Sequence, residues 1–314
     1  MSDSGLKILL AAPRGFCAGV DRAIDIVERA LEIFGAPIYV RHEIVHNRHV
    51  VDRLRRQGVI FVDEVEEIPD GAVAIFSAHG VSKRVRADAG KRPLRVVDAT
   101  CPLVTKVHLE VHRLAKEGYT ILLIGHQGHI EVEGTIGQLP AGRMTLVQNP
   151  AEAETVEVAD PERVAYVTQT TLSLDETDDV VKILRRRFPK LRAPAKDDIC
   201  YATQNRQNTV KAMMDQIDLL LVIGSKNSSN SNRLVEVARS RGVAAHLFDE
   251  PEEMEDGWFE GVRTVGLTAG ASAPEDLVQA TVKHLLDKHG GTVEEFRHTE
   301  ESVEFQLPRE LAKS

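Results

Sequence analysis

The sequence has few cysteines and no long apolar run. Only three cysteines occur among 314 residues, an odd number spaced too far apart for a disulfide framework. A reducing compartment is the better interpretation, and we expect the protein to be cytoplasmic. No apolar run approaches the roughly 18 residues that a membrane span needs, and the start MSDSGLKILLAAPRG predicts neither a signal nor a transit peptide. The formal net charge of −9 argues against nucleic acid or an anionic membrane as the main partner.

Motifs that would identify a familiar cofactor site are also missing. The sequence has neither the CxxC pairing usual in zinc sites nor the closely spaced cysteine run of ferredoxins. No GxGxxG segment follows a predicted strand, so we expect no bound nucleotide cofactor and in particular no nicotinamide site. Any metal site must therefore be assembled from residues that are distant in the sequence.

The three cysteines mark a repeated order of elements. Cys17, Cys101 and Cys200 each follow a strand-like or extended segment and precede a stretch with helical spacing. Short apolar strands alternate with amphipathic helices, which is typical of parallel sheets covered on both faces. We therefore predict an α/β protein of three similar small domains, with boundaries at 1–97, 98–196 and 197–285. Any alternating α/β chain could be divided in this way, but in each copy the same two strands are followed by unusual polar residues.

Each cysteine is expected between a strand and the N-terminus of a helix, where open α/β sheets bind ligands. Pro102 suits the first turn of the helix after Cys101, and Thr100 is a candidate N-cap. A helix N-terminus stabilises a thiolate and hence a metal–sulfur bond. Soft thiolates select zinc, copper(I) or an iron–sulfur cluster, and three of them leave one coordination position open. The spacing does not choose between zinc and a [4Fe–4S] cluster, and single cysteines can also be small buried core residues.

Polar side chains follow the predicted strands in every domain. The candidates are His42, His46, His79, His126, His129, Glu131, Glu133, Thr170, Thr171 and Ser272. Seven further histidines lie within or beside helices and surface strands and are set aside, namely His49, His108, His112, His246, His284, His289 and His298. Glu131 is a carboxyl group among histidines, which favours a proton donor over an exposed loop residue.

The Ser/Asn tract 225–232 has the composition of a flexible linker. It lies, however, directly between an apolar strand and a predicted helix, where a linker would be out of place. Hydroxyl groups, amides and backbone N–H groups at a helix N-terminus form a cradle for an anion. Together with histidines from the other two domains, this tract predicts a diphosphate ligand.

Nine segments together resemble one known family. They are PRGFCAGVDRAI, VRHEIVHNRHVV, IFSAHGVS, DATCPLVTKVH, GHQGHIEVEGT, TQTTLS, DDICYATQNRQ, GSKNSSNSNRL and TAGASAP. These segments are long, and they occur in one order between residues 6 and 285 without large gaps. They resemble the LytB-type 4-hydroxy-3-methylbut-2-enyl diphosphate reductases, iron–sulfur enzymes of the non-mevalonate isoprenoid pathway.

The resemblance implies a pseudo-threefold trefoil of three α/β domains around a central iron–sulfur cluster, with the tail 286–314 packed back on the core. The [4Fe–4S] cluster would be held by Cys17, Cys101 and Cys200, and one iron would lack a protein ligand. The implied reaction is a two-electron, two-proton removal of the allylic hydroxyl, which gives isopentenyl and dimethylallyl diphosphates. The electrons would come from a transient ferredoxin or flavodoxin partner.

The resemblance also implies roles for single residues. The substrate hydroxyl would bind the open iron, with Thr170, His129 and Glu131 as catalytic groups and Glu131 as the proton donor. The diphosphate would be held by His46, His79, His129, Thr170, Ser228, Ser229, Asn230 and Ser272. One residue departs from the family pattern, since Ile130 stands where proline is common and relaxes the restriction on φ.

Two other functions stay open at this point. A cluster-dependent hydro-lyase would use the open iron without net electron transfer. A zinc-stapled anion-binding protein would use the metal only as a scaffold. Glu131 beside His129 in a loop favours an enzyme over the scaffold.

Overall fold

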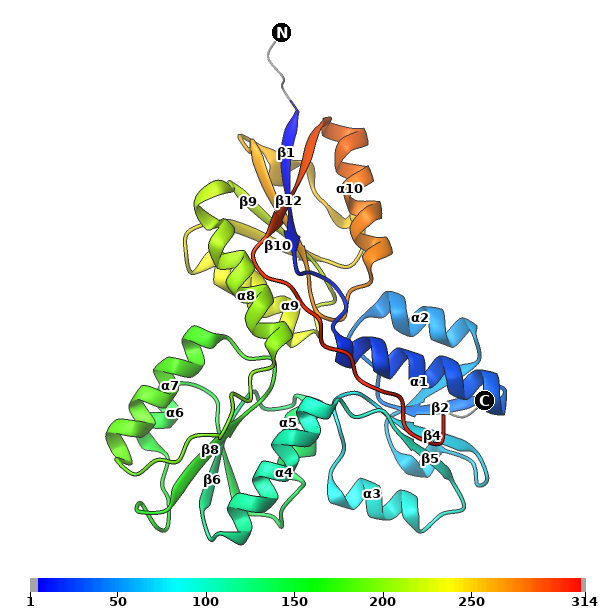
Figure 1. The fold of residues 1–314 in the computed structure, drawn as a ribbon, viewed down its shortest axis with the longest axis vertical. Helices are drawn as coiled ribbons and strands as arrows, with labels where there is room; N and C mark the ends of the chain where they lie inside the picture. The colour runs from blue at the N-terminus through cyan, green and yellow to red at the C-terminus, as the bar shows by residue number, and fades with distance from the viewer. Residues whose placement is uncertain (1–4, 312–314) are drawn as a thin grey trace. The chain divides into compact units, whose positions relative to one another are not determined.

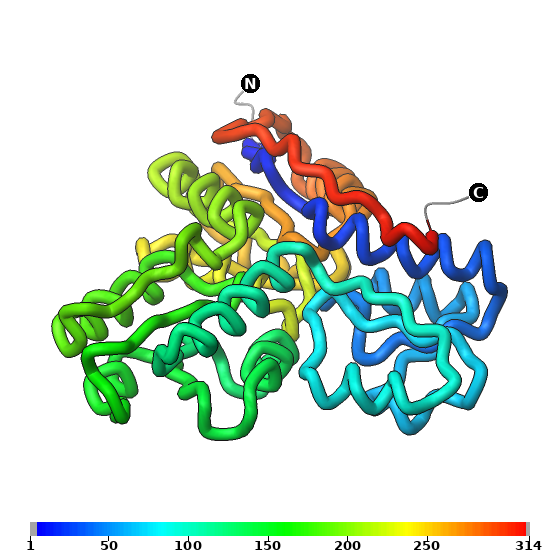
Figure 2. Tube along the Cα trace, turned by 60° about the horizontal axis from the view of Figure 1, so that its bottom comes forward, coloured from blue at the N-terminus to red at the C-terminus, as the bar shows by residue number. Residues whose placement is uncertain are grey.

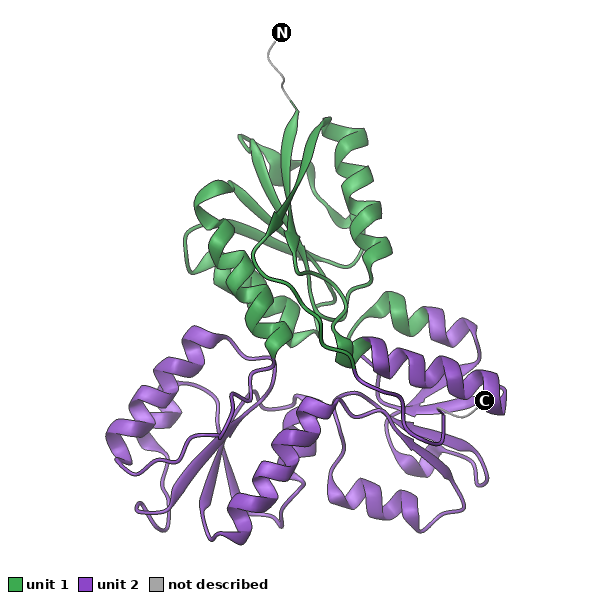
Figure 3. Cartoon of the chain, viewed as in Figure 1, with its two compact units in different colours: residues 1–20, 46–52, 201–304 green, residues 21–45, 53–200, 305–314 purple. Residues whose placement is uncertain are grey.

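The computed structural model describes residues 5–311, which form two compact units (Figure 3). Among the described residues, unit 1 contains 5–20, 46–52 and 201–304, and unit 2 contains 21–45, 53–200 and 305–311. None of the helices within residues 5–311 is long and apolar enough to cross a membrane.

Unit 1 is built on a five-stranded sheet in the order β10-β9-β11-β1-β12 (Figure 1). Its strands are β1 (Leu6–Ala12), β9 (Leu219–Ile223), β10 (Ala244–Phe248), β11 (Thr264–Ala269) and β12 (Gly291–Arg297). All neighbouring strands are parallel. Figure 2 shows the N-terminal β1 in blue beside the C-terminal β12 in red.

Helices cover both faces of this sheet. The helical elements that lie wholly in unit 1 are α8 (Tyr201–Met213), α9 (Ser229–Arg239), α10 (Glu275–His289) and the 3-10 turns η2 (Met214–Gln216), η3 (Pro251–Glu253) and η4 (Asp256–Phe259). Leu219 and Leu221 of β9 pack with α10, whereas Leu220 and Val222 pack with α8 and α9. This two-sided burial explains why β9 is apolar at every position.

Unit 2 holds two smaller parallel sheets. The first has the order β3-β2-β4-β5 and consists of β2 (Ile38–Arg41), β3 (Val59–Val62), β4 (Val73–Phe76) and β5 (Arg95–Asp98). The helical elements near it in the chain are α1 (Ala18–Phe34), α2 (Arg48–Arg56), α3 (Lys83–Gly90) and the turn η1 (Val65–Glu67). The helix α3 packs through Val85 and Ala89 against Phe76 of β4.

The second sheet of unit 2 has the order β7-β6-β8 and consists of β6 (Thr120–Ile124), β7 (Met144–Val147) and β8 (Val164–Thr168). Its helices are α4 (Pro102–Lys116), α5 (Ile130–Ile136), α6 (Pro150–Thr155) and α7 (Leu174–Arg187). The apolar faces of α4 and α5 pack on one side of the sheet, and those of α6 and α7 pack on the other. The prediction of an α/β chain with three parallel sheets is confirmed.

The segment just before each cysteine pairs with a strand of one of the three sheets. The strand β5, just before Cys101, pairs with β4, and Arg192, ahead of Cys200, forms a bridge with Ala165 of β8. The strand β1, just before Cys17, pairs with β11 and β12. The structure therefore differs from the division at 1–97, because β1 belongs to the sheet of residues 219–297.

One local expectation is corrected, and the segment 286–314 contains a strand that was not predicted. The N-cap of α4 is Cys101 itself, not Thr100, because the Thr100 hydroxyl donates to Asp98 at 2.5 Å. The segment 286–314 contains a strand, β12, in register with the whole of β1, followed by Leu311, which is buried in unit 2. Most side chains of β12 are exposed, so no apolar pattern marked it in the sequence.

Candidate functional site

Each cysteine backbone is held by the same kind of hydrogen bond. The amide of the cysteine donates to a carbonyl in the loop after a central strand. These bonds run from Cys17 to Ala271 (3.2 Å), from Cys101 to Ala78 (2.9 Å) and from Cys200 to Thr170 (3.0 Å). The acceptors are Thr170 itself and the residues just before Ser272 and His79, so each cysteine is tied to a loop that carries a predicted site residue.

The cysteines keep the features that a thiolate ligand needs. All three are described by the structure, and none of them forms a disulfide bond. Each lies at or next to the start of a helix, and each is partly accessible. The backbone N–H groups of a helix N-terminus favour the thiolate over the thiol. Within residues 5–311, no three His, Cys, Asp or Glu side chains are grouped so that they could hold a single metal ion.

Glu131 is a buried carboxyl group with two close donors. Its side chain is on the first turn of α5, and the residue is only 3% exposed. The Thr170 amide donates to Oε1 at 2.6 Å, and the Thr170 hydroxyl donates to Oε2 at 2.9 Å. The two residues are therefore locked together, although they are far apart in the sequence.

Burial raises the pKa of Glu131 from 4.5 to about 7. The two hydrogen bonds from Thr170 act in the opposite direction, and the negative charge of nearby Asp198 adds to the increase. A carboxyl group with a pKa near 7 can both hold and release a proton at neutral pH, which is what a general acid requires.

In unit 1, Asn230 has the same place on its helix as Glu131 has in unit 2, so a side-chain amide stands there in place of a carboxyl group. Asn230 is the second residue of α9, as Glu131 is the second residue of α5. Its Oδ1 accepts the Ala271 amide at 2.8 Å, and the Ala271 carbonyl holds Cys17 just as that of Thr170 holds Cys200. A neutral amide therefore suffices to fix this loop, and the ionisable proton of Glu131 is not needed for the structure.

His129 contacts Glu131, and His79 lies next to His129. His129 is the N-cap of α5, and its Nδ1 accepts the Glu131 amide at 3.2 Å, which places the proton of a neutral ring on Nε2. The His79 ring lies edge-on to it, with ring centroids 6.1 Å apart. The Ser77 hydroxyl lies 3.2 Å from Nδ1 of His79. In unit 2 the structure thus groups four predicted residues: Glu131, Thr170, His129 and His79.

The other residues predicted to bind the diphosphate lie in unit 1, namely His46, Ser228, Ser229, Asn230 and Ser272. Ser228 is the N-cap of α9 and accepts the Ser231 amide, and Ser229 is the first residue of this helix. The Ser272 hydroxyl lies 3.5 Å from that of Ser228 and donates to the His46 carbonyl at 2.8 Å. The tract between β9 and α9 is therefore an ordered loop and helix start, as the sequence predicts, and not a linker.

Ile130 is accommodated without loss of the helix start. It is the first residue of α5, a position where proline is favoured because its N–H has no partner within the helix. The turn before it is closed by the His129 amide, which donates to the His126 carbonyl at 3.2 Å.

Two buried polar residues were not identified from the sequence. Asp198 is completely buried as a side chain, its Oδ2 accepts the Thr168 amide, and burial raises its pKa. Gln169 is 1% exposed and bridges His126 to the Thr171 hydroxyl. The sequence could have indicated Gln169 only through its position in the segment TQTT, and Asp198 only through its position in the segment DDIC.

The raised pKa of Glu131 predicts a pH-dependent stability. The folded state holds a proton that the unfolded chain releases, so stability falls as pH rises from 4.5 to about 7. Glu131→Gln removes this penalty and should be more stable than the parent at pH 8 by on the order of 3 kcal/mol, with little difference near pH 4. Denaturant unfolding across this pH range measures the effect. The exposed Glu133→Gln is the matched control on the same helix, and an equal effect in both variants would contradict the prediction.

The fold and these loops define a parallel α/β enzyme with a buried acid group. Residues 8–286 match the model of the LytB protein family, so the chain belongs to the LytB family. A curated relative from Tolumonas auensis, a 4-hydroxy-3-methylbut-2-enyl diphosphate reductase, is 57% identical over 308 residues, which cover 98% of this chain and 99% of the relative.

Solved structures show the same relationship. The E-1-hydroxy-2-methyl-but-2-enyl-4-diphosphate reductase from Plasmodium falciparum superposes with a TM-score of 0.95 at 38% identity, over 98% of this chain and 97% of that one. A second structure, described as (E)-4-hydroxy-3-methyl-but-2-enyl diphosphate reductase, the terminal enzyme of the non-mevalonate pathway, has a TM-score of 0.63 at 33% identity, over 90% and 99%. The predicted family and fold class are confirmed.

Proposed function

We propose that this chain catalyses the reductive dehydroxylation of (E)-4-hydroxy-3-methylbut-2-enyl diphosphate. The allylic C–O bond breaks, two electrons enter, one proton leaves with the oxygen as water, and a second proton is added to the allyl carbon skeleton. The products are isopentenyl and dimethylallyl diphosphates. The observation that carries the proposal is the buried Glu131, bonded to Thr170 and titrating near neutral pH, in a chain of the LytB family.

The proposed cofactor is a [4Fe–4S] cluster held by Cys17, Cys101 and Cys200. The donor set fits, because three thiols at helix starts are soft ligands and leave one iron without a protein ligand. When bound, such a cluster supplies electrons one at a time and an iron that can polarise a C–O bond. Thiolate ligands of this kind require a reducing compartment, so we place the enzyme in the cytoplasm.

Glu131 delivers the proton that turns the hydroxyl group into water. Its burial keeps a large fraction of the carboxyl protonated at pH 7, and the hydrogen bonds from Thr170 fix its orientation. Once it has lost a proton, the carboxylate is stabilised by the same two donors. A neutral His129 carries its proton on Nε2, since Nδ1 accepts the Glu131 amide, and this Nε2–H is the group that we propose donates to the diphosphate.

The diphosphate is held by hydroxyl, amide and imidazole groups. The residues proposed for this role are His46, His79, His129, Thr170, Ser228, Ser229, Asn230 and Ser272. The start of α9 supports the assignment, because its N–H groups and the serine hydroxyls next to them favour a negative charge. The electrons come from a separate carrier, a ferredoxin or flavodoxin, since no nucleotide-binding fingerprint is present in the sequence.

Anaerobic reconstitution with iron and sulfide, followed by an assay with a reduced dye, tests this function. Oxidation of the dye that depends on the hydroxylated diphosphate, with formation of the two isoprenyl diphosphates, is the expected result. Turnover of that substrate without a reductant would instead favour a hydro-lyase. Stoichiometric zinc and no iron would favour the scaffold protein.

A further inference from the structure

A basic residue follows each cysteine at nearly the same distance along the chain. Arg22 and Lys106 are the fifth residues after Cys17 and Cys101, and Arg206 is the sixth after Cys200. All three lie on the helix that the cysteine starts, namely α1, α4 and α8. Each side chain turns away from its own cysteine segment and donates to main-chain carbonyls just ahead of another cysteine.

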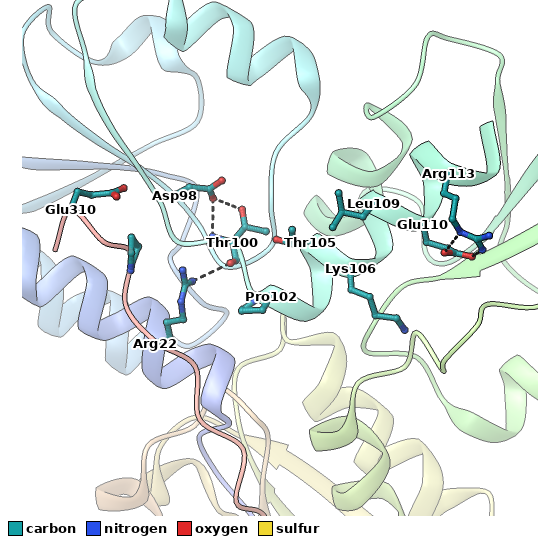
Figure 4. Close-up of a pocket in the computed structure, with 11 residues that line it drawn as sticks. Arg22, Asp98, Thr100, Pro102, Thr105, Lys106, Leu109, Glu110, Arg113 and Glu310 are labelled. Atoms are coloured by element: carbon teal, nitrogen blue, oxygen red, sulfur yellow. Dashed lines mark hydrogen bonds and ion pairs between the residues drawn. The ribbon is translucent and has the colours of Figure 1, made fainter. Parts of the chain in front are cut away.

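Arg22 holds the segment before Cys101. Its Nη1 donates to the Thr100 carbonyl at 3.1 Å and to the Ala99 carbonyl at 3.5 Å, and its Nε donates to the Gln306 carbonyl at 2.8 Å. Figure 4 shows this guanidinium directed at Thr100, on the wall of a pocket of about 630 Å³. All three acceptors are neutral carbonyls, so no carboxylate is left unpaired when Arg22 is removed.

Lys106 holds the segment before Cys200. Its ammonium group donates to the Lys196 and Asp197 carbonyls, each at 2.7 Å, and to Asp198 Oδ1 at 3.1 Å. The carboxyl group of Asp198 is completely buried, and its other oxygen accepts the Thr168 amide. Lys106 lines the same pocket as Arg22, and the two lie on either side of Pro102 (Figure 4).

Arg206 holds the segment before Cys17. Its guanidinium donates to the Gly15 carbonyl at 2.6 and 3.2 Å and to the Phe16 carbonyl at 3.3 Å. Arg206 is completely buried and is paired with Glu301 at 3.0 Å. A buried cation needs a paired carboxylate and several hydrogen-bond acceptors. The Arg206 contacts therefore fix the backbone of Gly15 and Phe16, just before Cys17.

We propose that Arg22, Lys106 and Arg206 are equivalent positioning residues for the three cysteine ligands, each fixing the backbone that leads into one cysteine. The inference rests on the proposed cluster. Fixed carbonyls orient the cysteine backbone before the metal arrives, in the way that outer-shell groups orient metal ligands. The charge of Arg22, which donates to neutral carbonyls, also stabilises a thiolate and favours uptake of an electron by a negatively charged cluster.

Arg22→Met is the cleanest test, because it removes the donors and the charge but keeps most of the side-chain volume. We expect retention of the cluster against an iron chelator to fall about 10- to 100-fold, the usual effect of removing an outer-shell partner. The midpoint potential of the cluster should become more negative, and Arg22→Lys should restore part of both properties. Arg29→Met is the matched control, since Arg29 is on the same helix and pairs with Glu32 at the surface.

A second variant covers the buried pair. Lys106→Met combined with Asp198→Asn removes the cation without leaving an unpaired carboxylate. The same loss of cluster retention is expected, but the midpoint potential should change little, because one charge of each sign is removed. The thermal midpoint of each iron-free variant shows whether it is folded. Folded variants that retain the cluster as well as the parent does would overturn the inference. A parent protein that takes up no iron would overturn the proposed function instead, so the two failures are distinguishable.

Discussion

Glutamine in place of Glu131 is expected to lower kcat by about 10²- to 10⁴-fold, the range for loss of a general acid. Iron content and substrate affinity should stay close to those of the parent. The structural reason is that the amide oxygen of glutamine can still accept the Thr170 amide, as Asn230 accepts the Ala271 amide in unit 1. Only the transferable proton is lost. Steady-state rates with a reduced dye, together with iron analysis, measure the effect.

Glu133→Gln is the control for this experiment, because Glu133 is an exposed carboxylate two residues further along α5. It should leave kcat nearly unchanged. If Glu131→Gln lost its iron, the residue would be structural. If it kept full turnover, another group would have to supply the proton.

Serine in place of any one of Cys17, Cys101 and Cys200 is expected to abolish stable cluster binding and thus nearly all turnover. The serine hydroxyl is a weaker acid than a thiol, and its oxygen is a harder ligand than sulfur. The sequence contains only three cysteines, so no other thiolate can replace the lost one. The backbone hydrogen bond that holds each cysteine segment should survive, since it uses the main-chain amide. Iron and sulfide analysis after anaerobic reconstitution measures the loss, and the thermal midpoint of the iron-free protein checks the fold.

Ser228→Ala provides the contrast for the cysteine variants. Ser228 belongs to the proposed diphosphate group, so this change should raise KM and leave the iron content intact. A cysteine variant that bound as much iron as the parent would show that this cysteine is not a ligand.

Much of the fold could be predicted because burial leaves a direct pattern in the sequence. The strand β9 is apolar at all positions and is buried on both faces. The strand β12 left no such signal, because its residues are mostly exposed at the edge of the sheet. The place of β1 could not be predicted either, since its partners β11 and β12 lie more than two hundred residues away in the sequence.

Some residues of the candidate site could likewise be predicted from the sequence, and others could not. Polar residues directly after apolar strands were predictable, because the carboxyl ends of parallel strands lie at one edge of a sheet. Glu131 and Thr170 were both found by this rule, and the structure shows that they are hydrogen-bonded to each other, which was not predicted. Arg22 and Lys106 were missed because their acceptors are main-chain carbonyls, which carry no residue-type signal. Only the regular spacing of basic residues after the cysteines could have indicated them.

The central claim is that three cysteines hold a four-iron cluster whose fourth iron is open to the substrate. Mössbauer spectroscopy of the anaerobically reconstituted protein, recorded with and without (E)-4-hydroxy-3-methylbut-2-enyl diphosphate, tests it most directly. We predict that the substrate changes the signal of a single iron site and leaves the others nearly unchanged. A spectrum that does not respond to the substrate, or a protein that contains zinc in place of iron, would contradict the claim.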